Sequence, residues 1–117
     1  MNEWKISFMA GGTVTSPKGF CAGATSAGIK KNSKSGLDLG ILFSETPCVT
    51  AGVFTTNRIK SAPVILCQQK LQNGKASALI ANSGCANAST GERGMADAEE
   101  MATLLAGSLG IDSEDVL

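Results

Sequence analysis

The clearest pattern along the chain is helical and lies near its end. Over residues 91–108 and at the position that follows, apolar side chains recur at helical spacing, at Met95, Ala98, Met101, Ala102, Leu105 and Leu109. This spacing predicts an amphipathic helix whose apolar stripe packs into a core. Ser89 and Glu92 have the spacing of a capping box at its start, and Gly110 is a typical helix stop.

Upstream of this helix the pattern changes to the alternation that is typical of strands. Apolar side chains occupy every second position over residues 37–43 and again over residues 49–53. The segment Ser44-Glu-Thr-Pro47 between them predicts a turn that sets two strands side by side. Residues 76–82 are small and apolar, and they predict a further strand.

The segment that opens with Ser61-Ala-Pro63 fits two structures. Val64, Cys67 and Leu71 would share one face of a helix, whereas residues 64–66 could also form a short strand; Asn73-Gly74 predicts a turn at its end. Several strands followed by a capped helix predict an α/β or α+β fold. Because so small a sheet leaves its edges exposed, we expect other segments to cover them.

Composition narrows the classes of function. The 117 residues are 43% hydrophobic and 4% aromatic, which predicts one small globular domain. Ten basic residues balance ten acidic ones, and the densest basic stretch, Lys30, Lys31 and Lys34, is typical of a solvated loop. We expect no nucleic-acid partner, because no basic face with stacking aromatics is visible. No apolar run approaches the roughly 20 residues of a membrane span, and no signal peptide is recognisable, so we expect a cytoplasmic protein without a membrane partner.

The four cysteines, Cys21, Cys48, Cys67 and Cys85, form no Cys-x-x-Cys pair, and the chain has no His. A zinc site would therefore need all four cysteines. We expect no metal and predict reduced, mostly buried thiols.

The candidate chemistry lies in the segment Asn82-Ser-Gly-Cys-Ala-Asn-Ala-Ser-Thr-Gly91, between the last strand and the predicted helix. Its small and polar residues let backbone approach a ligand closely. The first turn of a helix offers unpaired N–H groups and partial positive charge, which stabilise an anion or a developing oxyanion. A loop that merely caps a helix would have a similar sequence. Phosphate-loop, dinucleotide-loop and nucleophile-elbow motifs are absent, and without His any catalytic base must be another group, such as an α-amino group.

Several segments, taken in order, resemble one known family. They are Pro17-Lys-Gly-Phe20, Ala22-Gly23, Gly28-Ile-Lys30, Asp38-Leu39, Ala51-Gly-Val-Phe-Thr-Thr-Asn57, Ala62-Pro-Val64, Asn82-Ser-Gly84, Ala86-Asn-Ala88, Thr90-Gly91 and Gly94 with Asp97-Ala98. This order resembles the ornithine acetyltransferase (glutamate N-acetyltransferase) family of arginine biosynthesis. The match spans almost the whole chain, and no single short pattern carries it.

The resemblance implies a fold, an activity and a site. The implied fold is α/β (α+β), a sandwich of stacked β-sheets with helices outside, of which residues 1–117 would be a single N-terminal segment of the catalytic domain, incomplete at its C-terminus. The family's precursor cuts itself before a Thr, whose freed α-amino group serves as the base. That Thr carries an acetyl group from N-acetylornithine to glutamate; no cofactor is implied, although some members accept acetyl-CoA as a substrate. By this match, Thr90 and Gly91 would form the oxyanion hole.

The chain also departs from the family pattern. Cys85 stands where the family more often has Asn. The family's nucleophilic Thr and substrate-binding positions lie beyond Leu117, so we expect Thr55, Thr56 and Thr103 to be structural. The expected partner is the remaining C-terminal β chain, in a hetero-oligomer of α and β chains. We also expect a fragment, because a new apolar segment begins at Val116-Leu117.

Three hypotheses follow for the function of the chain. The first is an enzyme segment that is active only together with the remaining polypeptide. The second is a non-catalytic module that holds an anion at the helix N-terminus, residues 89–94, and the third is a structural subunit. A cleavage-site Thr further along the polypeptide would favour the first.

Overall fold

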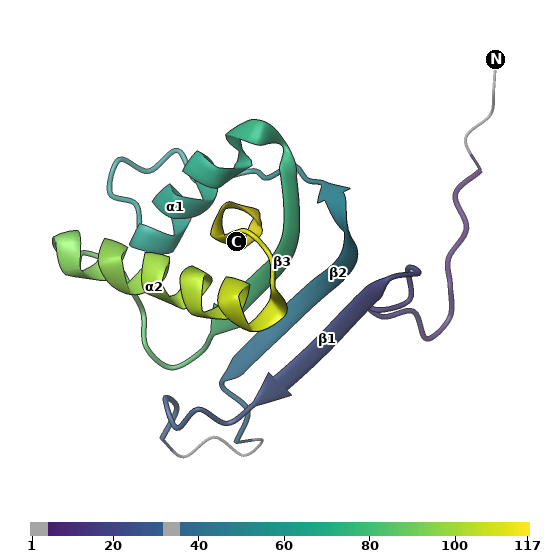
Figure 1. Cartoon of the computed structure of the whole chain (residues 1–117), viewed down its shortest axis with the longest axis horizontal. Helices are drawn as coiled ribbons and strands as arrows, with labels where there is room; N and C mark the ends of the chain where they lie inside the picture. The colour runs from purple at the N-terminus through teal and green to yellow at the C-terminus, as the bar shows by residue number, and fades with distance from the viewer. Residues whose placement is uncertain (1–4, 32–35) are drawn as a thin grey trace.

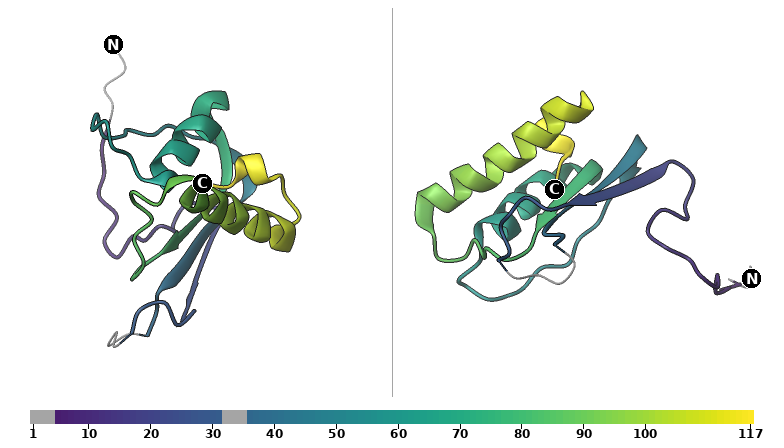
Figure 2. Two further views of the ribbon diagram at one scale, coloured as in Figure 1. Left: turned by 90° about the vertical axis from the view of Figure 1, so that its left-hand side faces the viewer. Right: turned by 90° about the horizontal axis from the view of Figure 1, so that it is seen from below.

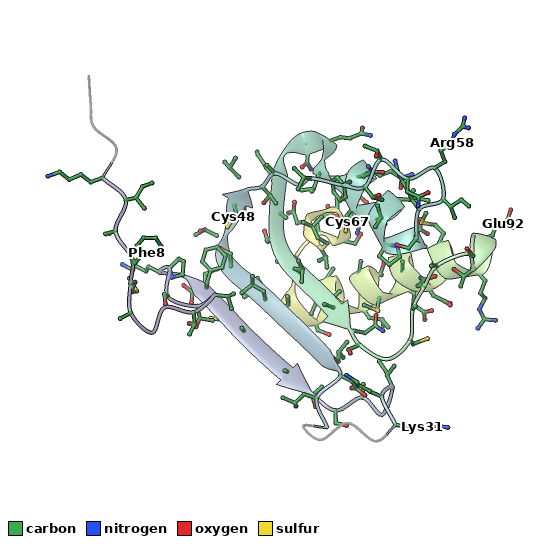
Figure 3. The ribbon with its side chains drawn as sticks, turned by 180° about the vertical axis from the view of Figure 1, so that it is seen from behind. Phe8, Lys31, Cys48, Arg58, Cys67 and Glu92 are labelled. Carbon is green, nitrogen blue, oxygen red and sulfur yellow. The ribbon has the colours of Figure 1, made fainter. Side chains whose placement is uncertain are left out.

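The computed structural model describes residues 5–31 and 36–117. The elements follow one another as β1 (Phe20–Thr25), β2 (Leu39–Val49), α1 (Ala62–Lys70), the short 3-10 helix η1 (Leu71–Asn73), β3 (Lys75–Asn82), α2 (Gly91–Leu109) and the 3-10 helix η2 (Ser113–Asp115), as Figure 1 shows. Residues 5–19 run away from the helices, and Phe8 among them is 98% exposed (Figure 3).

The three strands form one antiparallel sheet in the order β1-β2-β3. The outer edge of β3 also pairs with the C-terminal residues, because Leu117 N–H donates to Ala78 O and Ile80 N–H donates to Leu117 O, both at 2.9 Å. β3 is therefore bonded along both edges. Within the described residues, the outer edge of β1 pairs with no strand.

The core lies between one face of the sheet and α2, with α1 beside it (Figure 2). Its buried members come from β3, α2 and the C-terminal segment: Ala78, Ala102, Leu105, Ala106 and Val116. The opposite face carries Leu42 paired with Leu79, which is 43% exposed. In the described part of the chain no helix covers this second face (Figure 2). A hollow of about 260 Å³ opens on it.

Several predictions made from periodicity are confirmed. α2 spans Gly91–Leu109, and Ala102 and Leu105 of its predicted stripe are buried. Gly110 ends the helix in the left-handed conformation, and its N–H donates to Ala106 O. β3 covers the predicted strand. An antiparallel sheet with helices packed on it confirms the α+β class.

The ambiguous segment after Ser61 is a helix. Ser61 has extended backbone before α1, and Pro63 occupies the first turn, where its missing N–H costs no hydrogen bond. At the other end of α1, the buried Lys70 ammonium donates to the carbonyls of Ser113 and Val116, at 2.5 and 3.0 Å. These two bonds connect α1 to the C-terminal segment.

The predicted turn at Ser44–Pro47 and the second strand over residues 49–53 are wrong. β2 continues unbroken from Leu39 to Val49, and a bulge between Phe43 and Cys48 accommodates the polar stretch. Within the bulge the buried Ser44 hydroxyl donates to Thr46 O at 2.6 Å, which satisfies it without a turn. The chain beyond Val49 leaves the sheet, and Val53 is fully exposed.

The prediction of mostly buried thiols is also wrong. All four cysteines are free, but Cys21 and Cys85 are exposed and Cys48 and Cys67 are only partly buried. The reason is that β1 carries its side chains on open faces and Cys85 lies in a surface loop. Partial burial raises the pKa of the Cys67 thiol, and the charge of Lys70 opposes that shift.

Within residues 5–31 and 36–117, no helix is both long and apolar enough to cross a membrane.

Candidate functional site

The loop between β3 and α2 is held by hydrogen bonds of its own and by a contact with α1. Asn82 Nδ2 donates to Cys85 O at 3.2 Å, and the N–H of Ala62, the first residue of α1, donates to Asn87 O at 3.2 Å. The Cys85 side chain is exposed, and only its backbone carbonyl takes part in the loop. The loop conformation therefore does not depend on the thiol.

Thr90 and Gly91 lie at the start of α2, with Thr90 as the N-cap residue and Gly91 as the first helical residue. The predicted capping box is wrong. Ser89 adopts a left-handed conformation with φ of 56°, and no side chain accepts a capping hydrogen bond at Thr90. A capping-box serine needs extended backbone directly before the first turn. Here the helix begins one residue later than that motif requires.

The backbone at this position alternates in handedness. φ is 56° at Ser89, −103° at Thr90 and 63° at Gly91, and Gly tolerates its value because it has no Cβ. Such alternation gathers successive N–H groups into a concave nest that binds anions. The N-terminal end of the 19-residue α2 adds a partial positive charge at the same point. Both features are of a kind that favours negative charge near Thr90 and Gly91.

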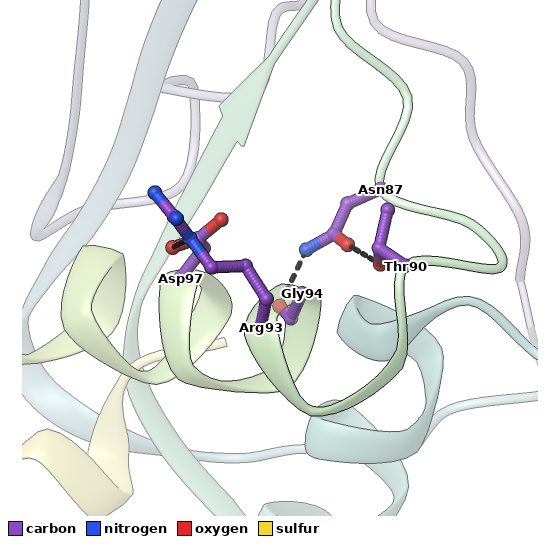
Figure 4. Close-up of polar contacts among 5 residues, drawn as sticks. All are labelled: Asn87, Thr90, Arg93, Gly94 and Asp97. Atoms are coloured by element: carbon purple, nitrogen blue, oxygen red, sulfur yellow. Dashed lines mark hydrogen bonds and ion pairs between the residues drawn. The ribbon is translucent and has the colours of Figure 1, made fainter.

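The Thr90 side chain belongs to a hydrogen-bonded group that crosses the first turn of α2 (Figure 4). The Thr90 hydroxyl donates to Asn87 Oδ1, and Asn87 Nδ2 donates to Gly94 O at 2.7 Å. A Cβ at Gly94 would stand 2.6 Å from Thr90 Cβ and would overlap Thr90 Oγ1 and Asn87 Oδ1. The absence of a side chain at Gly94 is therefore what allows Thr90 and Asn87 to meet.

Figure 4 also shows two charged residues of α2. Arg93 and Asp97 form an ion pair of 3.5 Å whose side chains are 88% and 56% exposed. Exposed pairs of this kind contribute little to stability. The two charges also offset each other close to the helix start.

A cavity of about 360 Å³ adjoins Thr90. Its walls come from α1, α2, the end of β3 and the loop between β3 and α2, together with Ile29 and Leu117. They are mainly apolar and include Leu66, Ile80, Met101, Asn82, Asn87 and Asp97. An apolar cavity with a few polar groups at its border is typical of a site for a small organic group. Among the described residues, no three Cys, Asp or Glu side chains gather as a metal site.

A second set of hydrogen bonds, centred on Asp38, holds the start of the loop between β3 and α2 (the site loop). The buried Asp38 carboxylate accepts the backbone N–H groups of Ala27 and Ile29 at 2.6 Å and of Lys30 at 2.8 Å. The bond from Lys30, followed by the one from Ala27, holds the pKa of Asp38 below its ordinary value, against the opposing effect of burial. Asp38 O also accepts the N–H of Ser83 at 2.8 Å. One residue thus joins the β1–β2 connection to the site loop.

Sequence reasoning did not assign these roles to Asp38 or Asn87, although both belong to segments of the family resemblance. For Asn87, the available indication was its place three residues before a helix-capping Thr, where Asn side chains often bond to nearby backbone. For Asp38 no indication was available, because its partners are brought together by the fold.

Comparison with models of protein families shows to which family the chain belongs. The model of the ArgJ family matches residues 21–117. The chain belongs to the ArgJ family. The arginine biosynthesis bifunctional protein ArgJ of Dehalococcoides mccartyi is 54% identical over 96% of this chain and 28% of its own length. The ArgJ protein of Synechocystis is 43% identical over the whole chain and 27% of its own length. The chain thus spans about a quarter of these relatives.

Two solved structures of ArgJ-family proteins are similar to the fold. The ArgJ protein of Bacillus halodurans superimposes with a TM-score of 0.85 at 38% identity, covering 92% of this chain and 56% of that chain. Ornithine acetyltransferase of Mycobacterium tuberculosis, solved in complex with ornithine, gives a TM-score of 0.80 at 44% identity, covering 88% and 55%.

Proposed function

We propose that this chain is the N-terminal part of a cytoplasmic acetyltransferase that moves an acetyl group from N-acetylornithine to glutamate in arginine biosynthesis. Thr90 and Gly91 would supply its oxyanion hole. Membership of the ArgJ family supports the activity. The observation that carries the site assignment is the alternating backbone of Ser89, Thr90 and Gly91 at the N-terminus of α2, which is suited to receive a negatively charged oxygen.

The proposed chemistry divides between this chain and the remaining polypeptide. A Thr beyond residue 117, with its own α-amino group as base, attacks the acetyl carbonyl of the donor. The carbonyl oxygen gains negative charge in the tetrahedral intermediate. The N–H of Gly91 and the hydroxyl of Thr90 donate to it, and the intermediate collapses to an acetyl-threonine and free ornithine. The amine of glutamate then takes the acetyl group through a second such intermediate, and acetyl-CoA could serve as another donor.

Two observations support a partner chain from the same precursor. This chain covers 28% of the Dehalococcoides relative but 56% of the solved Bacillus chain, so that solved chain is about half as long as the relative. This ratio supports a precursor that is cut into α and β chains. The uncovered sheet face with Leu42 and Leu79 supports a second sheet stacked there, since an apolar face of a sheet is stable only when it is buried.

The substitution Thr90→Val tests the proposal in the complete enzyme, meaning the full-length protein that contains this chain. Valine keeps the shape of threonine and removes the hydroxyl. We expect kcat for N-acetylglutamate formation to fall by about 10²–10³, with KM little changed, because the donor acts only when the oxygen gains charge. Stability should fall by no more than about 1 kcal/mol, the worth of one hydrogen bond to Asn87.

Ser89→Ala is the matched control, because it removes the neighbouring hydroxyl and leaves Thr90 and Asn87 in place. It should keep the wild-type rate. A Thr90→Val enzyme whose rate stays within a few-fold of wild type would refute the oxyanion role. It would leave residues 89–94 as a helix start that binds an anion or only caps the helix.

A further inference from the structure

Asn87 contacts Thr90 directly, and its side-chain orientation is fixed by the helix. Its Nδ2 donates to Gly94 O at 2.7 Å, so Oδ1 must face the Thr90 hydroxyl. The reverse orientation would place Oδ1 against Gly94 O, with two acceptors in contact and no proton between them. Thr90 is therefore the donor in the Thr90–Asn87 bond.

Asn87 is itself held at three points. Its backbone carbonyl accepts the N–H of Ala62 from α1, its Nδ2 is bound to α2, and its Oδ1 is bound to Thr90. The missing side chain at Gly94 leaves room for both side chains. A residue held in this way can fix the rotamer of its neighbour, which is the requirement for precise placement of a catalytic donor.

We propose that Asn87 is the positioning residue of the oxyanion site: it holds the Thr90 hydroxyl in place and accepts its hydrogen bond until the oxyanion forms. This inference rests on the proposed function. A hydroxyl has a single proton, so Thr90 cannot donate to Asn87 and to the acetyl oxygen with full strength at once.

The competition between these two acceptors favours the transition state. The acetyl oxygen of the bound donor is neutral, as is Asn87 Oδ1. A hydrogen bond from Thr90 to the acetyl oxygen is then no stronger than its bond to Asn87. Once the oxygen becomes negative, the bond to it is charge-assisted and roughly twice as strong as a neutral one. The Thr90 hydroxyl then donates its hydrogen bond to the oxyanion instead of to Asn87. An interaction that forms only at this stage raises kcat without tightening the binding of the ground state.

A double-mutant cycle in the complete enzyme tests this role, with kcat and KM measured for Asn87→Ala, Thr90→Val and the double variant. We expect Asn87→Ala to lower kcat by about tenfold or more and to leave KM within a few-fold. In the Thr90→Val background the same change should alter kcat by less than about threefold, because the group that Asn87 positions is already gone. Asn87→Ser, whose single oxygen cannot serve both partners, replaces Asn87→Ala in the cycle if that variant does not fold.

Asn82→Ala is the matched control. Asn82 lies in the same loop and donates to Cys85 O, but it makes no hydrogen bond to Thr90. Its effect on kcat, whatever its size, should be equal in both backgrounds. If the Asn87 change lowers kcat by the same factor in both backgrounds, or does not lower it at all, Asn87 only supports the loop and the inference is overturned. If Thr90→Val itself keeps the wild-type rate, the proposed function fails instead.

Discussion

The carboxylate of Asp38 holds the backbone of Lys30, whose N–H donates to Asp38 Oδ2 at 2.8 Å. Lys30 in turn lies against the site loop, since a Cβ at Gly84 would stand 3.0 Å from Lys30 Cα and 2.9 Å from Lys30 Cβ. Lys30 Nζ also lies 3.5 Å from Ser83 Oγ. Lys30, which follows β1, therefore packs directly on the start of the loop that leads to Thr90.

Asp38→Asn should destabilise the complete enzyme at neutral pH. The amide can accept hydrogen bonds only through its oxygen, so at least one of the N–H groups of Ala27, Ile29 and Lys30 would face an NH₂ group instead of an acceptor. We expect a clear fall in the melting temperature, measured by thermal unfolding. Asp112→Asn is the control, because exposed Asp112 accepts one N–H, from Glu114, and Asn serves equally well at such a position.

The melting temperatures of wild type and Asp38→Asn should differ less at acidic pH than at neutral pH. The pKa of folded Asp38 lies below its ordinary value of 3.8, so the ionised form favours the folded state. This contribution is complete above the unfolded pKa and is lost as the pH falls through the lower folded value. The melting temperatures of wild type and Asp38→Asn should therefore converge below about pH 4. A difference that stays constant from neutral pH down to about pH 3 would contradict the role of the charge.

Gly94→Ala should damage the site, although alanine is the better helix former. The added methyl group would overlap Thr90 Oγ1 and Asn87 Oδ1, and it would displace the bond between them. We expect kcat to fall at least as far as in Thr90→Val. Gly107→Ala is the control in the same helix, because a Cβ there meets nothing within 4 Å. That change should raise stability by roughly 1 kcal/mol and leave kcat unchanged. Wild-type activity in Gly94→Ala would show that the first turn adapts and that the contact is not required.

Residues 1–117 alone should form no N-acetylglutamate from N-acetylornithine and glutamate. By family resemblance, the nucleophilic Thr and its α-amino base belong to the remaining polypeptide. The isolated chain should also be poorly stable or self-associated, because among the residues that the structure describes none pairs with the outer edge of β1 and no helix covers the face bearing Leu42 and Leu79. Size-exclusion chromatography and thermal unfolding check the second expectation. A monomer that unfolds cooperatively at an ordinary mesophilic temperature would favour an independent binding module.

The elements that sequence analysis predicted well are those whose burial is regular. Ala102 and Leu105 repeat with the period of the helix, so α2 was visible in the sequence. β1 was not, because Phe20–Thr25 is mostly small residues that are exposed on both faces, and no alternation marks it. Pro47 and its polar neighbours have the composition of a turn, which is why sequence predicts a turn at the β2 bulge, whereas pairing with β3 keeps the strand intact.

The site was predictable only in part, for a similar reason. Family resemblance and the helical pattern together predict Thr90 and Gly91 as site residues, and the structure places both at the start of α2. Local sequence predicts the start of α2 at Gly91 correctly, but it wrongly makes Ser89 the capping residue, because the left-handed backbone at Ser89 depends on how the loop packs against α1. The partners of Asp38 and Asn87 are set by tertiary contacts, which no local pattern encodes.

The missing side chain at Gly94 also has a consequence for recognising or transplanting this site. A Thr-Gly pair occurs by chance in many unrelated proteins. The physical unit described above is longer, because the hydroxyl of Thr90 is oriented by Asn87 and the two fit together only over Gly94. The pattern to search for is therefore Asn-x-x-Thr-Gly-x-x-Gly at the start of a helix. A designer who grafts the site onto another scaffold would need to carry all four positions together.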